Sequence, residues 1–106
     1  EGTIYFEYDK YNLSSSALSD IRALANSIKS SSSKVRIEGH CDERGTREYN
    51  LALGEKRANA VSELLQVNGV SSSSITTVSY GEEKPVTYGS NESSWSKNRR
   101  AVVKVL

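Results

Sequence analysis

The chain has 106 residues, of which 36% are hydrophobic and 25% are charged, and its formal net charge is +1. These values are typical of one globular domain and exclude a chain too polar to form a core. A nearly neutral balance provides no strong field for nucleic acid or an anionic membrane, and no apolar run is long enough to span a bilayer. We therefore expect a single domain over residues 1–106 that recognises its ligand through local contacts.

The sequence decides neither how the protein is targeted nor whether its compartment is oxidising. The N-terminus lacks the pattern of a signal peptide, so we expect a mature or trimmed domain whose targeting segment, if any, has been removed. Cys41 is the only cysteine, which excludes an internal disulfide and leaves the redox compartment undecided.

The first half of the chain alternates between strand-like and helix-like patterns. Residues 4–8 alternate between apolar or aromatic and other side chains with a period of two, which predicts a half-buried strand. Apolar residues then recur every three or four positions over 17–28, after a serine cluster, and predict an amphipathic helix with serine caps. Residues 35–40 return to a period of two and predict a second strand. If these two strands are neighbours, the helix between them makes them parallel.

The second half repeats this alternation and ends in a long loop and a strand. From Asn50 the period is helical again, and Asn68-Gly69 supplies a left-handed stop. Residues 75–80 and 101–106 predict two more strands, with a loop over residues 81–95 before the last. The order β-α-β-α-β-loop-β predicts an α/β (α+β) sandwich, in which two main helices pack on one face of a small mixed sheet.

A mixture of acidic and basic residues follows the second predicted strand. Residues 42–48 carry both charges around Gly45, which suits a tight or left-handed turn. Ligands of open α/β sheets gather at this end of the strands. A carboxylate beside a guanidinium suits a zwitterionic ligand, whereas an anion draws on a basic cluster and a metal on several carboxylates or imidazoles. The pattern therefore favours a site for a ligand with both charges.

Four strings in the chain resemble the successive signature blocks of the peptidoglycan-associated lipoprotein family, which is grouped with the C-terminal domain of outer-membrane protein A. The strings are YFEYDKYNL, EGHCDERGTREYNLALGEKRANAV, VSYGEEKP and KNRRAVV, and they cover nearly the whole chain. The resemblance implies an OmpA-like fold that binds peptidoglycan through the meso-diaminopimelate of its stem peptide, without catalysis, cofactor, metal or nucleic acid. It further implies a lipid anchor upstream of this chain, a place on the periplasmic face of the outer membrane, and TolB as a partner in the Tol-Pal system.

The resemblance also implies which residues bind the ligand. Asp42 matches the aspartate that holds the ligand's ammonium group, and Arg57 matches the arginine that holds its carboxylate. The other residues that we expect at the site are Tyr8, Asp9, Cys41, Arg44, Leu53, Ala58, Asn98 and Arg99. Tyr8 stands where phenylalanine is common, and Cys41 where alanine or threonine is common. We expect neither difference to abolish binding.

The same residues allow other interpretations. Without the resemblance, Asp42 is more readily a turn cap and Arg57 part of a solvated helix face. His40 and Cys41 next to two acids suggest a metal site or a thiol nucleophile, but strand alternation would point them to opposite sides. An OmpA-like or flagellar stator-type module could act mainly by binding proteins. A murein hydrolase or amidase is disfavoured because the chain lacks paired histidines and a triad-like set.

Overall fold

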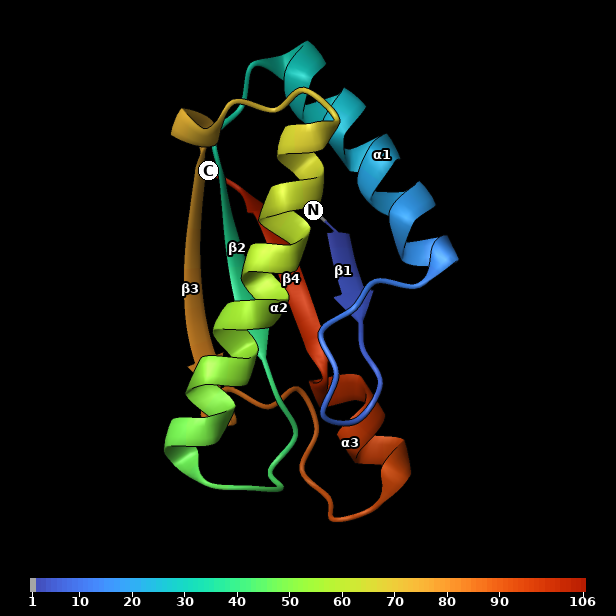
Figure 1. Cartoon of the computed structure of the whole chain (residues 1–106). Helices are drawn as coiled ribbons and strands as arrows, with labels where there is room; N and C mark the ends of the chain where they lie inside the picture. The colour runs from blue at the N-terminus through green and yellow to red at the C-terminus, as the bar shows by residue number, and fades with distance from the viewer. Residues whose placement is uncertain (1) are drawn as a thin grey trace.

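Helices and strands alternate along residues 2–106, which are the residues that the computed structural model describes. In chain order they are β1 (Gly2–Tyr5), α1 (Ser15–Ser31), β2 (Val35–His40), α2 (Arg47–Val67), the 3-10 turn η1 (Ser72–Ser74), β3 (Ile75–Gly81), α3 (Glu92–Asn98) and β4 (Arg100–Val105) (Figure 1). None of the helices in this range is both long enough and apolar enough to cross a membrane.

The strands form one open mixed sheet with the order β1-β4-β2-β3 (Figure 1). β4 lies between β1 and β2 and is antiparallel to both, whereas β2 and β3 are parallel. The first two strands are therefore not neighbours, and the parallel pair is the one that α2 connects. This arrangement confirms the predicted mixed sheet and brings the carboxyl ends of β2 and β3 to the same edge.

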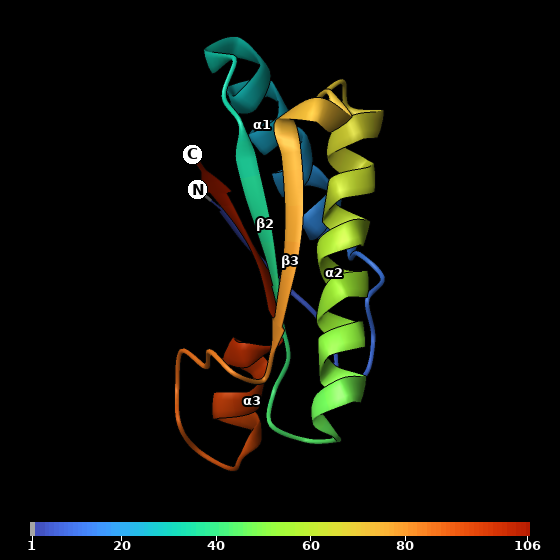
Figure 2. The ribbon, with the colours of Figure 1, turned by 90° about the vertical axis from the view of Figure 1, so that its left-hand side faces the viewer.

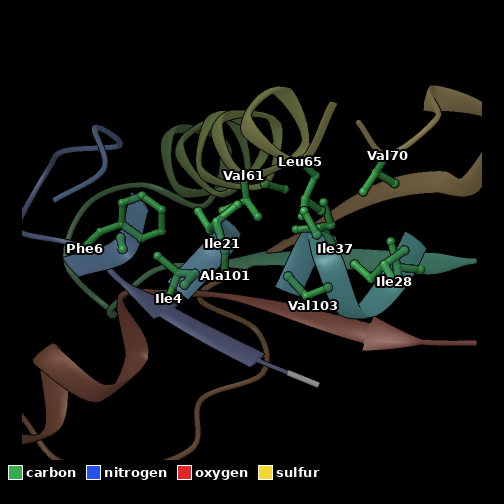
Figure 3. Close-up of a cluster of buried hydrophobic side chains, with 14 residues drawn as sticks. Ile4, Phe6, Ile21, Ile28, Ile37, Val61, Leu65, Val70, Ala101 and Val103 are labelled. Carbon is green, nitrogen blue, oxygen red and sulfur yellow. The ribbon is translucent and has the colours of Figure 1, made fainter. Parts of the chain in front are cut away.

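α1 and α2 cover one face of this sheet, as predicted, and the apolar core lies between the helices and the strands (Figures 2 and 3). Ile37 and Val103 from the sheet and Ile21 and Leu65 from the helices are all 0% exposed. Burying an apolar side chain of this size stabilises a fold by about 1.5–3 kcal/mol. The periodic residues that predicted the helices are those that form this core.

Short hydroxyl side chains and one glycine set the helix ends. Ser14 begins α1 and Thr46 begins α2, each by accepting a hydrogen bond from the amide three residues on (3.1 Å in both cases). Ser32 ends α1 in the left-handed conformation. Gly45 has a φ of 100°, which confirms the left-handed turn expected there. Because Thr46 is the cap, α2 begins at Arg47 and not at Asn50, where the apolar period starts.

Two segments differ from the prediction. The first strand ends at Tyr5 and not at Tyr8, because the chain then turns back on itself with Asp9 at a φ of 56°. The predicted loop over residues 81–95 contains the start of α3, whose Asn91 cap accepts a hydrogen bond from the amide three residues on (3.0 Å). A helix of 7 residues with little apolar repetition leaves no periodic signal in the sequence.

α2 crosses β2 at two glycines, where the backbones meet directly. A Cβ atom added to Gly39 would lie 1.7 Å from the carbonyl oxygen of Gly54. The contact therefore depends on the absence of a side chain. Arg57 follows Gly54 by one turn on the same face of the helix, so its side chain is aimed at the end of β2.

Candidate ligand-binding site

A small cavity lies beyond the carboxyl end of β2. Its lining comes from the loop after β1, the loop after β2 and the first half of α2: Tyr8, Asp9, Cys41, Asp42, Arg44, Gly45, Tyr49, Asn50, Leu53 and Arg57. Its volume is about 40 Å³, which has room for a few water molecules. Asp42 and Arg57 both line this cavity, which confirms that the two predicted charges converge.

Arg57 forms the inner wall of the cavity and is 0% exposed. Its Nη1 donates to the carbonyl oxygen of His40 at the end of β2 (2.9 Å). Its Nε and Nη2 donate to the carbonyls of Lys10 (2.8 Å) and Glu7 (3.1 Å) in the loop after β1. Burial lowers the pKa of Arg57, although its guanidinium stays charged. The side chain thus ties two distant segments together while two of its five N–H donors have no role in these bonds.

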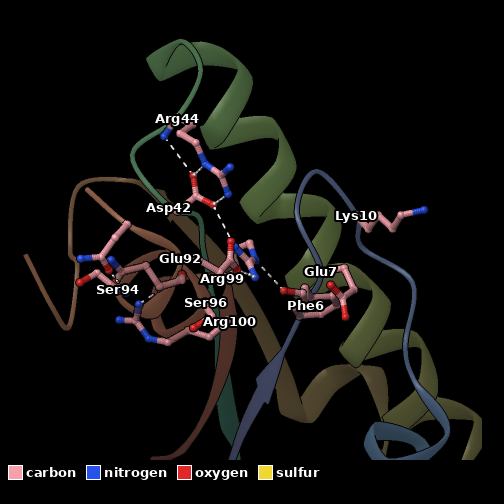
Figure 4. A network of polar contacts seen from close by, with 12 residues as sticks. Phe6, Glu7, Lys10, Asp42, Arg44, Glu92, Ser94, Ser96, Arg99 and Arg100 are labelled. Atoms are coloured by element: carbon pink, nitrogen blue, oxygen red, sulfur yellow. Dashed lines mark hydrogen bonds and ion pairs between the residues drawn. The ribbon is translucent and has the colours of Figure 1, made fainter. Parts of the chain in front are cut away.

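Asp42 holds a carboxylate that is 4% exposed and is contacted by two arginines (Figure 4). Arg44 donates to it three times, from Nε (3.2 Å), from Nη2 (2.9 Å) and from the backbone amide (3.0 Å). Nη1 of Arg99 lies 3.5 Å from Oδ2. Burial favours a raised pKa for Asp42, but the hydrogen bonds from Arg44 outweigh it and the pKa lies below its usual value. The carboxylate is therefore ionised at neutral pH.

The guanidinium of Arg44 lies between two aromatic rings. Its Cζ is 3.9 Å from the ring centre of Tyr8 and 4.0 Å from that of Trp95. The hydrogen bond to Asp42 raises the pKa of Arg44. The side chain is 29% exposed, so Arg44 separates Asp42 from solvent. Trp95 was not among the predicted site residues, because it belongs to the segment that was predicted to be a loop.

Two more lining residues, Tyr49 and Asn50, were not predicted from the sequence. The hydroxyl of Tyr49 donates to the carboxylate of Asp9, and this hydrogen bond raises the pKa of Tyr49. Nδ2 of Asn50 donates to the carbonyl of Arg44 (3.0 Å) and to Oε1 of Glu82 (2.8 Å). The sequence feature that could have identified Asn50 as a site residue is its position, a polar residue near the start of the apolar face of α2.

The structure places three of the predicted ligand-binding residues away from the cavity lining, namely Ala58, Asn98 and Arg99. Ala58 is part of the apolar core. Asn98 is buried and braces the loop before α3, with Oδ1 accepting from the amide of Val86 (2.8 Å) and Nδ2 donating to the carbonyl of Thr87 (3.0 Å). Ala58 and Asn98 belong to the sequence blocks that carry the family resemblance, but their contacts stabilise the fold around the site.

Arg99 lies behind Asp42 and not on the cavity surface. Its Nε donates to the carbonyl of Phe6 (2.8 Å) and its Nη2 to Glu92 (2.6 Å) (Figure 4). The hydrogen bond from Arg99 lowers the pKa of Glu92. Nη1, the group nearest Asp42, finds no hydrogen-bond partner within residues 2–106. Arg99 therefore supports Asp42 from the protein side.

Cys41 lines the cavity as a packed thiol, and its neighbour His40 lies in a different environment. Sγ of Cys41 contacts the carbonyl of Asn50 (3.2 Å), and burial raises the pKa of Cys41 to about 11. The ring of His40 lies 5.5 Å from that of Tyr80. Over the described part of the chain, the structure contains no group of three or more His, Cys, Asp and Glu residues suited to a metal ion.

Comparison with known sequences places these features in context. The model of the OmpA family matches residues 5–99. The chain is 50% identical over 102 residues to a peptidoglycan-associated lipoprotein of Pseudomonas aeruginosa, covering 96% of this chain and 61% of that protein. It is 48% identical over 102 residues to one from Pasteurella multocida, covering 95% and 68% respectively. The chain thus spans about three fifths of the length of the first of these relatives.

Comparison with solved structures agrees. The crystal structure of the peptidoglycan-associated lipoprotein from Burkholderia pseudomallei matches with a TM-score of 0.96 and 41% identity, covering 100% of this chain and 91% of that one. The C-terminal domain of MotB from Helicobacter pylori matches with a TM-score of 0.91 and covers 100% of this chain and 84% of that one. Its identity is only 19%, so this second likeness concerns the fold alone.

Proposed function

Because the chain belongs to the OmpA family and, within it, to the peptidoglycan-associated lipoproteins, we propose that it binds peptidoglycan noncovalently through the meso-diaminopimelate centre of the stem peptide. In this proposal the carboxylate of Asp42 receives the ligand's ammonium group and the guanidinium of Arg57 receives its carboxylate. The observation that carries the proposal is that these two opposite charges line one cavity. A zwitterionic centre satisfies both at once.

The ionisation of Asp42 and the fixed position of Arg57 support this assignment. The lowered pKa of Asp42 keeps the carboxylate negative at neutral pH. Arg57 uses three N–H groups on backbone carbonyls. Its other two N–H groups make none of these bonds, and in this proposal they receive the ligand's carboxylate. Binding is thus prepared by groups that the fold already holds in place.

The proposed activity is binding without chemistry. Cys41 is the only cysteine, and burial raises its pKa to about 11, so it is not a thiolate nucleophile at neutral pH. His40 is the only histidine, and burial with the nearby charge of Arg100 lowers its pKa to about 4. These properties favour an anchor over a hydrolase or amidase.

In the cell we propose that this domain links the outer membrane to the peptidoglycan layer as part of the Tol-Pal system. A lipid anchor upstream of the chain would hold it on the periplasmic face of the outer membrane, and TolB would be a second partner. The names of the lipoprotein relatives support this placement. An affinity pull-down with intact sacculi and with TolB separates the wall anchor from the alternative, a module that mainly binds proteins.

The test is a calorimetric titration with a stem peptide that contains diaminopimelate. We expect saturable binding to the native domain. In Asp42→Ala the binding free energy should weaken by about 2–5 kcal/mol, because the ligand's ammonium group is left without its counterpart. Glu43→Ala is the matched control, since Glu43 is the adjacent acid but is exposed and bonds to Ser90 (3.0 Å) outside the cavity. Absence of heat from the native domain would contradict the proposal, and equal binding of a lysine-type stem would contradict its selectivity.

A further inference from the structure

The carboxylate that would receive the ligand already has a cation in the absence of ligand. Arg44 bonds to both carboxylate oxygens of Asp42, at 3.2 and 2.9 Å. The cavity beside this pair holds only about 40 Å³. A ligand ammonium group therefore finds its partner occupied until the side chain of Arg44 moves.

We infer that Arg44 is the built-in occupant of the ammonium subsite and that a ligand binds there only by displacing it. This inference rests on the proposed function and deepens it. Asp42 would exchange one cation for another, and a neutral ligand group would provide nothing to replace the guanidinium.

The contacts of Arg44 are of a kind that can be exchanged. Its side chain bonds to one carboxylate and stacks on Tyr8 and Trp95. The side chain is 29% exposed, so it can move toward water without carrying a buried charge through the protein. Arg44 can therefore leave Asp42 without breaking the backbone contacts that hold the loop.

Arg99 is the arginine that stays. It is buried and bonds to the carbonyl of Phe6 and to Glu92, so its position is fixed by the fold. Its Nη1 lies 3.5 Å from Asp42 and has no hydrogen-bond partner in the described part of the chain. When Arg44 leaves, this group remains beside Asp42 and keeps the carboxylate ionised for the incoming ammonium.

The charge requirement follows from the cost of burying an unpaired ion. A ligand whose ammonium group has been acetylated would have to remove Arg44 from Asp42 and leave the carboxylate with Arg99 alone. Removing one partner of an ion pair whose carboxylate is only 4% exposed is unfavourable, although Arg99 and the backbone amide of Arg44 offset part of the cost. The native cavity should therefore bind the acetylated ligand more weakly than a cavity that lacks Arg44 does.

The experiment compares Arg44→Gln with Arg47→Gln. Arg47 is a matched control because it lies in the same part of the chain but is exposed and pairs with Glu83 (2.9 Å) outside the cavity. The probes are a stem tripeptide that contains diaminopimelate and the same peptide acetylated on the side-chain ammonium group. Calorimetry gives the affinity of each, and circular dichroism confirms that each variant is folded.

If Arg44 competes with the ligand, Arg44→Gln should bind the unmodified tripeptide roughly threefold to tenfold more tightly, because the ligand no longer displaces an ion pair whose side chains are 29% and 4% exposed. The acetylated peptide should gain affinity as well, because it too must displace Arg44 in the native chain, while Arg47→Gln should match the native chain for both peptides. Weaker or unchanged binding by Arg44→Gln would overturn the inference, since Arg44 would then be a ligand contact or a bystander.

Trp95 gives an independent readout, because it is the only tryptophan and its ring stacks on Arg44. Titration of the native chain should change the emission of Trp95 in parallel with the heat, and Arg44→Gln should show the shifted emission before any peptide is added. Saturable heat with constant emission would overturn the displacement of Arg44 but leave the proposed function intact. Absence of both signals in the native chain would overturn both.

Discussion

Two arginines border the same cavity but are held in different ways. At the floor, which we define as Arg57 with the carbonyls of Glu7, Lys10 and His40, the guanidinium is 0% exposed and bonds to backbone. At the mouth, which we define as Asp42, Arg44, Tyr8 and Trp95, the guanidinium is 29% exposed and bonds to side chains. Backbone carbonyls in a folded chain have fixed positions, whereas side chains can change partners. The floor therefore serves stability as well as binding, and the mouth can respond to a ligand.

The largest expected effect comes from removing the Arg57 side chain at the floor. Arg57→Ala removes the donor of one buried bond, to the His40 carbonyl, and of two partly buried bonds, to the carbonyls of Lys10 and Glu7, and each buried group left unsatisfied costs about 1–3 kcal/mol. We expect the free energy of unfolding to fall by about 3–5 kcal/mol in urea titrations monitored by circular dichroism. In Arg47→Ala, which loses one exposed ion pair, the change should be below about 1 kcal/mol. Equal changes in the two variants would show that Arg57 has no structural role.

The second prediction concerns the side chain of His40, whose carbonyl belongs to the floor. Burial, assisted by the charge of Arg100, lowers the pKa of His40 from 6.5 to about 4. The unfolded chain therefore takes up a proton at a higher pH than the folded chain. Stability is then fully present above pH 6.5 and is lost as the pH falls toward 4, by an amount on the order of 3 kcal/mol.

Urea midpoints measured at intervals from pH 7 to pH 4.5 test this dependence. His40 is the only histidine, so His40→Gln should flatten the curve in this range even if it lowers stability at every pH. A native curve that is already flat between pH 6.5 and 5 would contradict the buried neutral imidazole.

The third prediction concerns the glycine contact that places the floor. The Cβ atom in Gly39→Ala would meet the carbonyl oxygen of Gly54 at 1.7 Å, so α2 must move away from β2. We expect a loss of about 1–3 kcal/mol in the free energy of unfolding, as is typical of overpacking. Gly2→Ala is a useful control, because its Cβ would meet only the flexible end of Leu24. If both variants were as stable as the native chain, the close crossing would not be needed.

Much of the fold could be predicted from the sequence because its signals are local. The apolar period over residues 17–28 predicted α1, and Gly45 predicted the turn before α2. The end of β1 and the start of α3 could not be found in this way. The end of β1 depends on contacts with a distant segment, such as the hydrogen bond from the amide of Phe6 to the carbonyl of Arg99 (2.9 Å), whereas α3 has 7 residues with little apolar repetition.

The site was predicted less completely, for a related reason. Motif resemblance supplied Asp42 and Arg57, and the structure brings both to one cavity. It could not supply the partners that each side chain takes, because these depend on the path of the loops. The stacking of Arg44 on Trp95 joins the loop after β2 to α3, which lies far away in sequence, and no spacing rule connects them.

The smallest expected effect comes from removing the Arg44 side chain at the mouth. Arg44→Ala removes an ion pair whose arginine is 29% exposed and two cation–π contacts, which together stabilise a fold by about 1 kcal/mol or a little more. Part of this loss is offset because Asp42 keeps Arg99 as a neighbour at 3.5 Å. The free energy of unfolding should therefore fall by no more than about 1 kcal/mol, well below the change in Arg57→Ala. If the two losses were similar, Arg44 would be as much a structural element as Arg57, and the mouth could not open for a ligand without loosening the fold.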